Sequence, residues 1–395
     1  MNVQISNRLK DINGSAIRDI FKLLGDPNII SFAGGNPASS ALEPERIAAF
    51  AQEALAENGV NLLQYGQTEG YAPLRESAAE FFLHNGVKTD PGHILPVSGS
   101  QQGLDLICKA LLNEGDTMLV ENPTFLGALQ TFRTYGARFA AVETDEDGAI
   151  PESLEEQIRA HRPKLIYLIP TFQNPTGRTL SLERRRRIAE LVNEYQVPLI
   201  EDDPYCDLRY RGKALPAIKS FDEQGYVLYC NSFSKIISPG LRVAAVVCQD
   251  DGLLRKLVVG KQSTDVHSPN LNQAIIDKYL RSGLLQEHIR LICASYAKQM
   301  DAMQRMLSTF PASVSYTKPD GGIFLWCTLP EDFNTTQLLS TATKQGVAYI
   351  PGTHFYADGQ GHHNTMRLNF SNASLENIEK GMERLRALFL SQGLC

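Results

Sequence analysis

The stretch 231-NSFSKIISPGLR-242 follows an apolar run, 226-YVLYC-230, and places serines, a lysine and an arginine around a Pro-Gly turn. Taken alone, a Ser-x-x-Lys is most often no more than a solvated surface charge. Serine hydroxyls and an arginine fork are nevertheless the groups that bind a phosphate, because the guanidinium presents paired donors to its oxygens. A lysine amine beside that phosphate suggests a covalent imine with a phosphorylated aldehyde. If so, other segments of the chain should supply the remaining residues that bind such a cofactor.

The apolar run before this stretch is one of seven that recur between segments of helical periodicity. Segment 181–196, for example, has apolar residues at helical spacing behind Ser181, a candidate N-cap. Several runs are apolar on both faces, which predicts an α/β fold with a mostly parallel sheet covered by helices on both sides. The seven predicted strands are 94–98, 117–121, 138–143, 164–170, 197–201, 226–231 and 243–248.

The length of 395 residues exceeds the usual size of one hydrophobic core, so two domains are expected. After about residue 280 the pattern changes to a long helical stretch followed by short apolar runs, which predicts a second, smaller α+β domain. We expect an N-terminal helix and a segment joining the small domain over 1–45, a large cofactor-binding domain over 46–284 and a small C-terminal domain over 285–395.

Composition argues against several classes of function. The formal net charge of −6 gives no reason to expect nucleic-acid binding, and the basic run 184–187 is interpreted as a solvated helix face. The seven cysteines include no Cys-x-x-Cys pair, and His362 and His363 lie in a Gly-rich loop without partner ligands, so no metal site is predicted. Without a signal peptide or a membrane-length apolar run, the sequence predicts a cytoplasmic protein with no membrane partner.

Ligands of open parallel sheets bind beyond the carboxyl ends of the strands, so polar residues that directly follow the apolar runs are candidate site residues. Ser100 and Gln101 follow the run 94–98 at the start of a predicted helix. There the backbone N–H groups and the helix dipole favour an anion. These two residues form a second candidate phosphate-binding element, with an ordinary N-cap as the alternative.

Two further runs end in groups that suit a charged aromatic ring. Asn174, held extended by Pro175, could donate its amide to a ring oxygen, with a plain Asn-Pro turn as the alternative. Asp202 ends a buried strand, where a carboxylate is costly without a cation. A pyridinium N–H would supply that cation, and Tyr205 could reach the ring hydroxyl. The alternative for Asp202 is an arginine partner or a turn cap. With Lys235 as the covalent attachment, these groups predict pyridoxal 5'-phosphate as the cofactor.

The chain resembles the fold-type-I, class I/II pyridoxal-phosphate-dependent aminotransferases, and within them the aminoadipate, kynurenine and aromatic aminotransferase group. The resemblance covers nearly the whole chain, and the joint occurrence of its motifs at these spacings is highly specific. The motifs are SFAGGNP (31–37), LQYGQTEGYAPLRE (63–76), VSGSQQGLDL (97–106), ENPTF (121–125), PTFQNPTG (170–177), EDDPY (201–205), SFSKIISPGLR (232–242), KPDGGIFLW (318–326) and MRLNFS (366–371).

Carried over residue by residue, the resemblance implies a role for each cofactor-binding candidate. Lys235 matches the Schiff-base and proton-transfer lysine, and Asp202 matches the partner of the pyridine nitrogen. Asn174 and Tyr205 match the donors to the ring oxygen. Tyr65 matches a tyrosine that reaches the phosphate across a dimer interface, which implies a homodimer with shared active sites. The residues implied to bind the phosphate are Ser100, Gln101, Ser232, Ser234 and Arg242.

Four other residues are implied to contact the ring or the substrate. Phe125 matches the aromatic residue that stacks on the ring, with core packing as the alternative. Arg367 matches the arginine that binds the substrate α-carboxylate, with a surface arginine as the alternative. Gly35 lies in a glycine-rich segment that lets the backbone approach the substrate. Arg18 matches an arginine that recognises the substrate side chain in the aminoadipate group, with a solvated helix charge as the alternative.

The activity implied is transfer of an amino group from an aromatic, aliphatic, 2-aminoadipate-type or glutamate-type L-amino acid to a 2-oxo acid such as 2-oxoglutarate. A β-lyase or decarboxylase on the same scaffold would use the same cofactor residues and remains an alternative. The third possibility is a non-enzymatic, metabolite-binding regulator, which would not require both Lys235 and Arg367.

Overall fold

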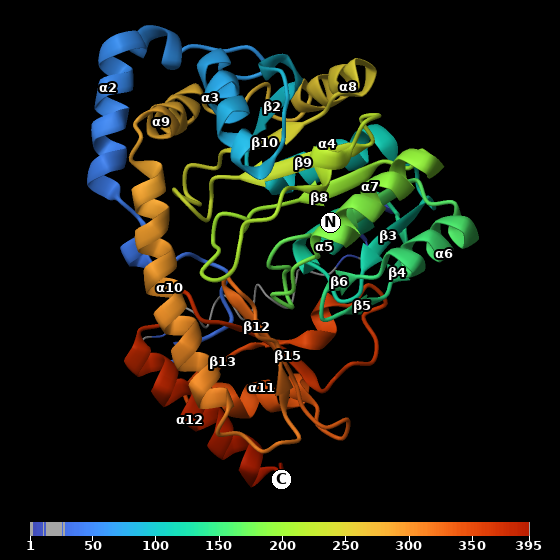
Figure 1. Cartoon of the computed structure of the whole chain (residues 1–395), viewed down its shortest axis with the longest axis vertical. Coiled ribbons are helices and arrows are strands. Elements are labelled where there is room, and N and C mark those ends of the chain that lie inside the picture. Colours follow the sequence, from blue (N-terminus) through green and yellow to red (C-terminus); the bar gives the residue numbers. More distant parts are fainter. Residues whose placement is uncertain (1–2, 11, 13–25, 27, 395) are drawn as a thin grey trace.

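The computed structural model describes residues 3–10, 12, 26 and 28–394, and its largest element is a seven-stranded sheet (Figure 1). The strand order across the sheet is β2 (Ile94–Val97), β10 (Ala244–Val247), β9 (Val227–Ser232), β8 (Leu199–Asp202), β7 (Leu165–Leu168), β3 (Thr117–Glu121) and β4 (Arg138–Val142). Strand β10 is antiparallel to both of its neighbours, and all other neighbouring pairs are parallel. The predicted α/β fold with a mostly parallel sheet is therefore confirmed.

Helices cover this sheet, and each face has its own core. Leu119 of β3 and Ile166 of β7 lie in one buried cluster, and the next residues along these strands, Val120 and Tyr167, lie in another. Because alternate strand residues point to opposite faces, burial of both faces produces runs without polar alternation. The helices of this region are α2 (Pro44–Leu62), α3 (Ala72–Phe82), α4 (Ser100–Leu111), α5 (Leu126–Thr134), α6 (Pro151–His161), α7 (Leu182–Tyr195), α8 (Asp251–Gln262) and α9 (Asn270–Arg281).

Helix α7 corresponds to the helix predicted over 181–196, and the Ser181 side chain accepts the Arg184 backbone N–H as its N-cap. The interpretation of the basic run 184–187 as a solvated face is wrong for Arg185, which is fully buried. Four consecutive residues span a whole helical turn, so one of them must face the sheet. The acceptors of the Arg185 guanidinium are the carbonyl oxygens of Pro170, Leu180 and Pro216 and the hydroxyl of Thr171.

A second, antiparallel sheet of four strands follows later in the chain, in the lower part of Figure 1. A short parallel pair of β1 (Ile30–Ser31) and β13 (Val347–Ala348) places the start of the continuously described chain beside this region. The predicted division of the chain into domains at residues 45 and 284 stays a prediction. The elements of this region are β11 (Ser315–Tyr316), β12 (Phe324–Thr328), β15 (Thr365–Asn369), β14 (Ile350–Pro351), α10 (Leu285–Leu307), α11 (Thr335–Lys344) and α12 (Leu375–Ser391). Within the sequence of the large-sheet region, between β4 and α6, β5 (Thr144–Asp145) and β6 (Gly148–Ala149) form a separate antiparallel hairpin.

Within the described part of the chain, six cysteines are present and none forms a disulfide. The same described residues contain no group of three or more His, Cys, Asp or Glu side chains placed to hold a metal ion. None of the described helices is long and apolar enough to cross a membrane.

Candidate active site

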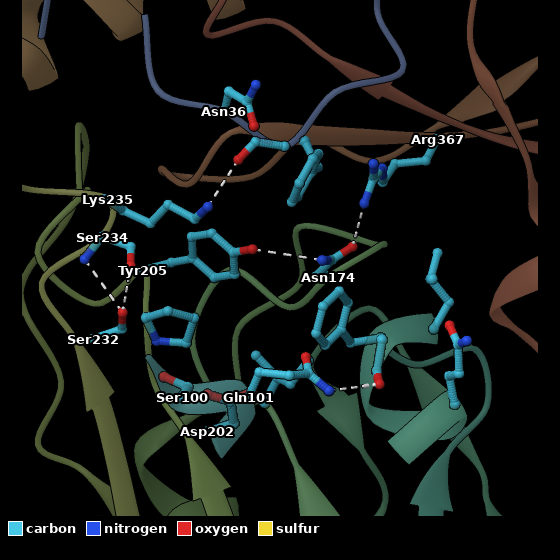
Figure 2. Close-up of a pocket in the computed structure, with 18 of the residues that line it drawn as sticks. Asn36, Ser100, Gln101, Asn174, Asp202, Tyr205, Ser232, Ser234, Lys235 and Arg367 are labelled. Carbon is cyan, nitrogen blue, oxygen red and sulfur yellow. Dashed lines mark hydrogen bonds between the residues drawn. The ribbon is translucent and has the colours of Figure 1, made fainter. Parts of the chain in front are cut away.

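A cavity of about 580 Å³ lies where the carboxyl ends of β8 and β9 meet the second sheet. Figure 2 shows side chains from both regions converging on it. The cavity brings together twelve of the fourteen residues predicted from the sequence, although they come from positions 35 to 367. They are Gly35, Ser100, Gln101, Phe125, Asn174, Asp202, Tyr205, Ser232, Ser234, Lys235, Arg242 and Arg367.

Lys235 lies three residues beyond the end of β9, and its Nζ donates to the Gly35 carbonyl at 2.8 Å (Figure 2). Burial lowers the pKa of the Lys235 amine to about 8, and the positive charges of Arg367 and Arg242 act in the same direction, against Asp202. A lysine with a lowered pKa has a larger neutral fraction near physiological pH, and only the neutral amine is a nucleophile. The site thus holds an amine that is ready to react with a carbonyl group.

Lys235 should titrate near pH 8 in the cofactor-free protein, because burial and the nearby arginines favour its neutral form. Trace labelling with acetic anhydride, followed by peptide mass spectrometry, measures this directly, since only neutral amines react. The labelling rate of Lys235 should rise about tenfold between pH 7 and pH 9, whereas an ordinary solvated lysine, with a pKa of about 10.4, should still react more steeply with pH over this range. A Lys235 profile that coincides with that of the exposed lysines of the same protein would contradict this expectation.

Asp202 is the last residue of β8, and its carboxylate is buried at the floor of the cavity. Its Oδ2 accepts a hydrogen bond from the Tyr167 hydroxyl at 2.8 Å, whereas its Oδ1 is buried with no hydrogen-bond partner. Burial raises the pKa of Asp202 to about 7, although the Tyr167 hydroxyl and Lys235 favour the charged form. Among the described residues no cation forms an ion pair with it, so the alternative of an arginine partner is not observed there.

The unpartnered Oδ1 of Asp202 indicates whether the residues of this site fit a pyridoxal phosphate cofactor. A buried carboxylate oxygen without a partner costs free energy that a cationic N–H donor would recover. A pyridinium nitrogen is such a donor, and the cavity that Asp202 faces also contains the Lys235 amine and buried serine hydroxyls. The residues present therefore fit pyridoxal 5'-phosphate.

Arg367, on β15, is only 4% exposed, so the alternative of a surface arginine is excluded. Its Nη1 donates to Asn174 Oδ1 and its Nη2 to the Ala33 carbonyl, both at 2.8 Å. The guanidinium carbon lies 4.1 Å from the centre of the Phe324 ring. Burial lowers the pKa of Arg367 to about 10, which leaves it charged at neutral pH. Its hydrogen-bond partners among the described residues are neutral, and such a buried guanidinium can bind a carboxylate.

Asn174 lies at the centre of a short chain of polar contacts. Its oxygen accepts from Arg367, so its Nδ2 is directed to the other side, where the Tyr205 hydroxyl lies 3.5 Å away (Figure 2). The Asn174–Pro175 peptide bond is cis. The amide and the phenol hydroxyl are thus placed as a pair of donors on the same side of the cavity.

The two predicted phosphate-binding elements lie together at one end of the cavity. The Ser232 hydroxyl donates to Ser234 Oγ at 2.9 Å, and the Ser100 hydroxyl is buried without a partner. The N-cap of α4 is Gly99, with no side-chain cap, so Ser100 is not an ordinary N-cap. A Cβ at Gly99, whose φ is +85°, would lie 2.1 Å from Arg242 Nη2. Only glycine lets the guanidinium lie across the start of this helix.

Gln101 and Phe125 contribute differently from each other. The Gln101 side chain donates to the Gly127 carbonyl and to Thr131 on α5, which leaves its backbone N–H at the start of α4 as its contribution to an anion site. Phe125 precedes α5 and lines the cavity, in agreement with the ring-stacking position. A Cβ at Gly127 would lie 2.5 Å from the Phe125 ring, so this glycine gives the ring its space.

Tyr65 does not line this cavity: it is 81% exposed, and its ring lies roughly perpendicular to the His267 ring. The other predicted residue, Arg18, lies outside the described residues. Tyr167 was not predicted from the sequence, because a tyrosine in an apolar strand looks like any core residue. The other residues that line the cavity and were not predicted are Asn36, Leu126, Gly127, Gln130, Ile169, Pro204 and Phe324. Of these, Asn36, Pro204 and Phe324 lie inside recognised motifs, which could have identified them.

Comparison with known proteins relates this geometry to a family. A model of the family "Aminotransferase class I and II" matches residues 27–385. Aromatic-amino-acid aminotransferase 1 of Thermococcus litoralis is 40% identical over 387 residues, which cover 96% of this chain and 92% of the relative. The 2-aminoadipate transaminase of Thermus thermophilus is 42% identical over 382 residues, with coverage of 95% and 94%.

Solved structures agree with this relationship. The Pyrococcus horikoshii kynurenine aminotransferase, in complex with PMP, superimposes with a TM-score of 0.94 at 38% identity, over 99% of this chain and 98% of that one. The α-aminoadipate aminotransferase of Thermus thermophilus, complexed with N-(5'-phosphopyridoxyl)-L-leucine, gives a TM-score of 0.90 at 38% identity, with coverage of 98% and 97%. The similarity therefore extends over the large sheet, the second sheet and the cavity between them.

Proposed function

The chain belongs to the class I and II aminotransferases, and we propose that it transfers the amino group of an aromatic, aliphatic or acidic L-amino acid to a 2-oxo acid such as 2-oxoglutarate. It is a pyridoxal-phosphate-dependent transaminase. The observation that supports the assignment best is the meeting of three buried groups in one cavity. They are the Lys235 amine, the unpartnered Asp202 oxygen and the Arg367 guanidinium.

The cofactor supplies an aldehyde that binds the amino group and a ring that takes up the electrons of the Cα–H bond. Asp202 would hold the ring nitrogen, Asn174 and Tyr205 would donate to the ring oxygen, and Phe125 would line the ring. The phosphate would be held by the hydroxyls of Ser100, Ser232 and Ser234, by the N–H groups of Ser100 and Gln101 at the start of α4, and by Arg242. These roles are proposed from the positions of the side chains in the cavity.

Lys235 and Arg367 act on the amino acid itself. Arg367 binds the α-carboxylate, which fixes the orientation of Cα in the cavity. The Lys235 amine would remove the proton from the substrate Cα and deliver it to the carbon of the cofactor that carries the aldehyde. The Gly35 carbonyl, which accepts from Lys235 Nζ, lies where it can guide this amine, and the backbone there lets the substrate approach closely.

The substrate is best identified with a panel of amino donors. Aromatic, aliphatic and acidic L-amino acids should be tested against 2-oxoglutarate, oxaloacetate and pyruvate, with both products identified. Formation of a 2-oxo acid from the donor and a new amino acid from the acceptor supports transamination. Release of ammonia or of carbon dioxide in step with turnover would instead indicate the β-lyase or decarboxylase alternative, which no feature of this site favours. Binding of amino acids without any turnover would instead support the alternative of a non-enzymatic, metabolite-binding regulator.

Acidic substrates need a further cation in the pocket. In the described part of the chain, the only cationic side chains that line the cavity are Lys235, Arg242 and Arg367, all with roles in binding the cofactor or the α-carboxylate. Other lining residues, such as Leu126 and Phe324, suit apolar side chains. We propose Arg18 as the residue that pairs with an acidic substrate side chain.

Arg18→Ala should lower kcat/KM for glutamate or 2-aminoadipate by about 10- to 150-fold, because a charge-assisted contact contributes roughly 1.5–3 kcal/mol. Turnover of phenylalanine, kynurenine or leucine should change little. Steady-state kinetics on matched acidic and aromatic donors measures the difference. An equal loss on both classes would show that Arg18 supports the N-terminal segment, and no loss would place it on a solvated face.

A homodimer that shares its active sites is proposed from the exposed segment around Tyr65. Val60, at 86%, Leu63, at 74%, and Tyr65, at 81%, are all highly exposed on one short stretch. An exposed apolar stretch of this kind typically marks an interaction site. A second copy of the chain that covers it would bring Tyr65 to the phosphate of the neighbouring site, as the resemblance implies.

Mixing Lys235→Ala and Tyr65→Phe protomers tests this sharing. In a mixed dimer both lesions fall into one site and leave the other intact, so random exchange of equal amounts should restore about one quarter of the wild-type sites. The measurement is activity after exchange compared with the average of the two parent variants. If exchange is verified by mass and activity stays at that average, Tyr65 acts within its own subunit or not at all.

A further inference from the structure

A partly buried polar cluster lies behind the phosphate-binding end of the cavity, outside the residues assigned above. Its members are Ser98, Gln102, Lys261, Asp265 and Ser268. Lys261, near the end of α8, has a side chain with no exposed surface. Its Nζ donates to Gln102 Oε1 at 2.8 Å, to Asp265 Oδ1 at 3.0 Å and to Ser268 Oγ at 3.0 Å. An ammonium group has three N–H donors, and here all three are used.

Asp265 and Gln102, which Lys261 holds in place, both form hydrogen bonds with Ser98. Asp265 Oδ2 accepts from the Ser98 hydroxyl at 3.0 Å and from Gln102 Nε2 at 2.7 Å. Gln102 Oε1, which also accepts from Lys261, accepts the Ser98 backbone N–H at 2.7 Å. The amide of Gln102 is therefore fixed at both ends, and Ser98 is held at its backbone N–H and at its hydroxyl.

Ser98 in turn determines where two phosphate-binding groups lie. Its carbonyl oxygen accepts from Arg242 Nη2 at 3.2 Å, and Ser98 directly precedes Gly99 and Ser100, where α4 begins. The cluster thus fixes both the guanidinium and the N–H groups at the start of the helix from behind. Donors that are held in place before the ligand arrives lose less entropy on binding.

We infer that Lys261 and Asp265 are positioning residues for the cofactor phosphate, acting through Ser98 and Gln102 without touching the cofactor. This inference rests on the proposed phosphate role of Ser100 and Arg242. Its distinctive consequence is that disruption of the cluster should weaken only the part of cofactor binding that the phosphate contributes. Pyridoxal, which has the same ring and aldehyde but no phosphate, should be insensitive to it.

The test compares the two ligands on the cofactor-free, full-length protein. Lys261→Met and Asp265→Asn should each raise the dissociation constant of pyridoxal 5'-phosphate by about tenfold or more, because each removes a charged partner from a network centred on the buried Lys261 ammonium. The dissociation constant of pyridoxal should stay at its wild-type value. Absorbance titration gives both constants, and kcat at saturating cofactor should remain close to wild type.

Lys219→Met is the matched control. Lys219 is likewise buried and paired with a buried carboxylate, Asp222, at 2.7 Å. Asp222 accepts the backbone N–H of Val227, where β9 begins, at the end of the strand opposite to the phosphate site. This variant should lose thermal stability without any change in the ratio of the two dissociation constants. If it changes that ratio as Lys261→Met does, the effect is one of general stability and the inference is wrong.

Ser98→Ala provides a second test in case Lys261→Met and Asp265→Asn do not fold. It removes only the hydroxyl that binds Asp265 and Ser268, and it should raise the dissociation constant of the phosphorylated cofactor alone. Unchanged affinity in all variants, or an equal loss for pyridoxal, would overturn the positioning role. If the wild-type protein binds pyridoxal 5'-phosphate no more tightly than pyridoxal, the proposed phosphate site itself is wrong. That outcome is distinct from a failure of the positioning role of Lys261 and Asp265.

Discussion

Replacement of Lys235 by alanine is expected to lower kcat by roughly 10⁴-fold, since the variant loses the group that moves the proton. The side chain lies in the cavity beside Asp202 and Arg367, and the nearest described backbone acceptor, the Gly35 carbonyl, cannot replace an amine. Ser232, Ser234 and the helix N-terminus are untouched by this change, so the variant should still bind pyridoxal 5'-phosphate, but without a covalent bond.

Two measurements separate this expectation from simple loss of folding. Borohydride reduction should fix the cofactor on Lys235 in the wild-type protein and on no lysine in the variant. An added small amine should restore part of the activity of Lys235→Ala, because it can enter the space that the side chain leaves. Lys219→Met, a change at another buried lysine, should retain kcat. Normal turnover by Lys235→Ala, or an adduct on a different lysine in the wild type, would contradict the mechanism.

Asp202→Asn should cause the second-largest loss, about 10²- to 10³-fold in kcat, which is typical for removal of one preorganised electrostatic contact. The Asp202 carboxylate has one oxygen bound to Tyr167 and the other free, and only an ionised carboxylate can hold a cationic ring nitrogen. The amide of asparagine has nearly the same shape but no charge, so the loss reports the charge itself. Steady-state kinetics at saturating cofactor measures it.

Asp203→Asn provides the control for this prediction. Asp203 is the next residue, is equally buried and accepts from Tyr229, but it does not line the cavity. Its variant should keep kcat within a small factor of wild type. If Asp202→Asn and Asp203→Asn lose the same activity, the effect belongs to the buried acidic stretch as a whole and Asp202 has no special role.

Much of this site could be predicted from the sequence because its chemistry follows from local order. Each strand is a short apolar run, and the residues that come directly after a parallel strand lie at the same edge of the sheet. For that reason Ser100, Asp202 and Lys235, from different runs, could be expected to lie together from the order of the runs alone. Motifs at fixed spacing then identified Arg367, which lies on the second sheet and could not have been placed by strand order.

The partners of buried charges were decided only by the tertiary structure. The apolar spacing of α7 puts position 185 on the buried face, but nothing in the sequence indicates which groups would accept hydrogen bonds from an arginine there, and Arg185 finds them at Pro170, Thr171, Leu180 and Pro216. The same holds for Lys261 and Asp265, which look like ordinary helix charges until packing places them against Ser98 and Gln102, more than 150 residues earlier in the chain. Hydrophobic periodicity is a local property of the chain and can be followed residue by residue. Burial and hydrogen-bond satisfaction, by contrast, depend on segments that meet only when the chain folds. The sequence by itself therefore determined the sheet, the edge of the sheet that carries the site, and the cofactor. The tertiary structure decided which buried charges support that site.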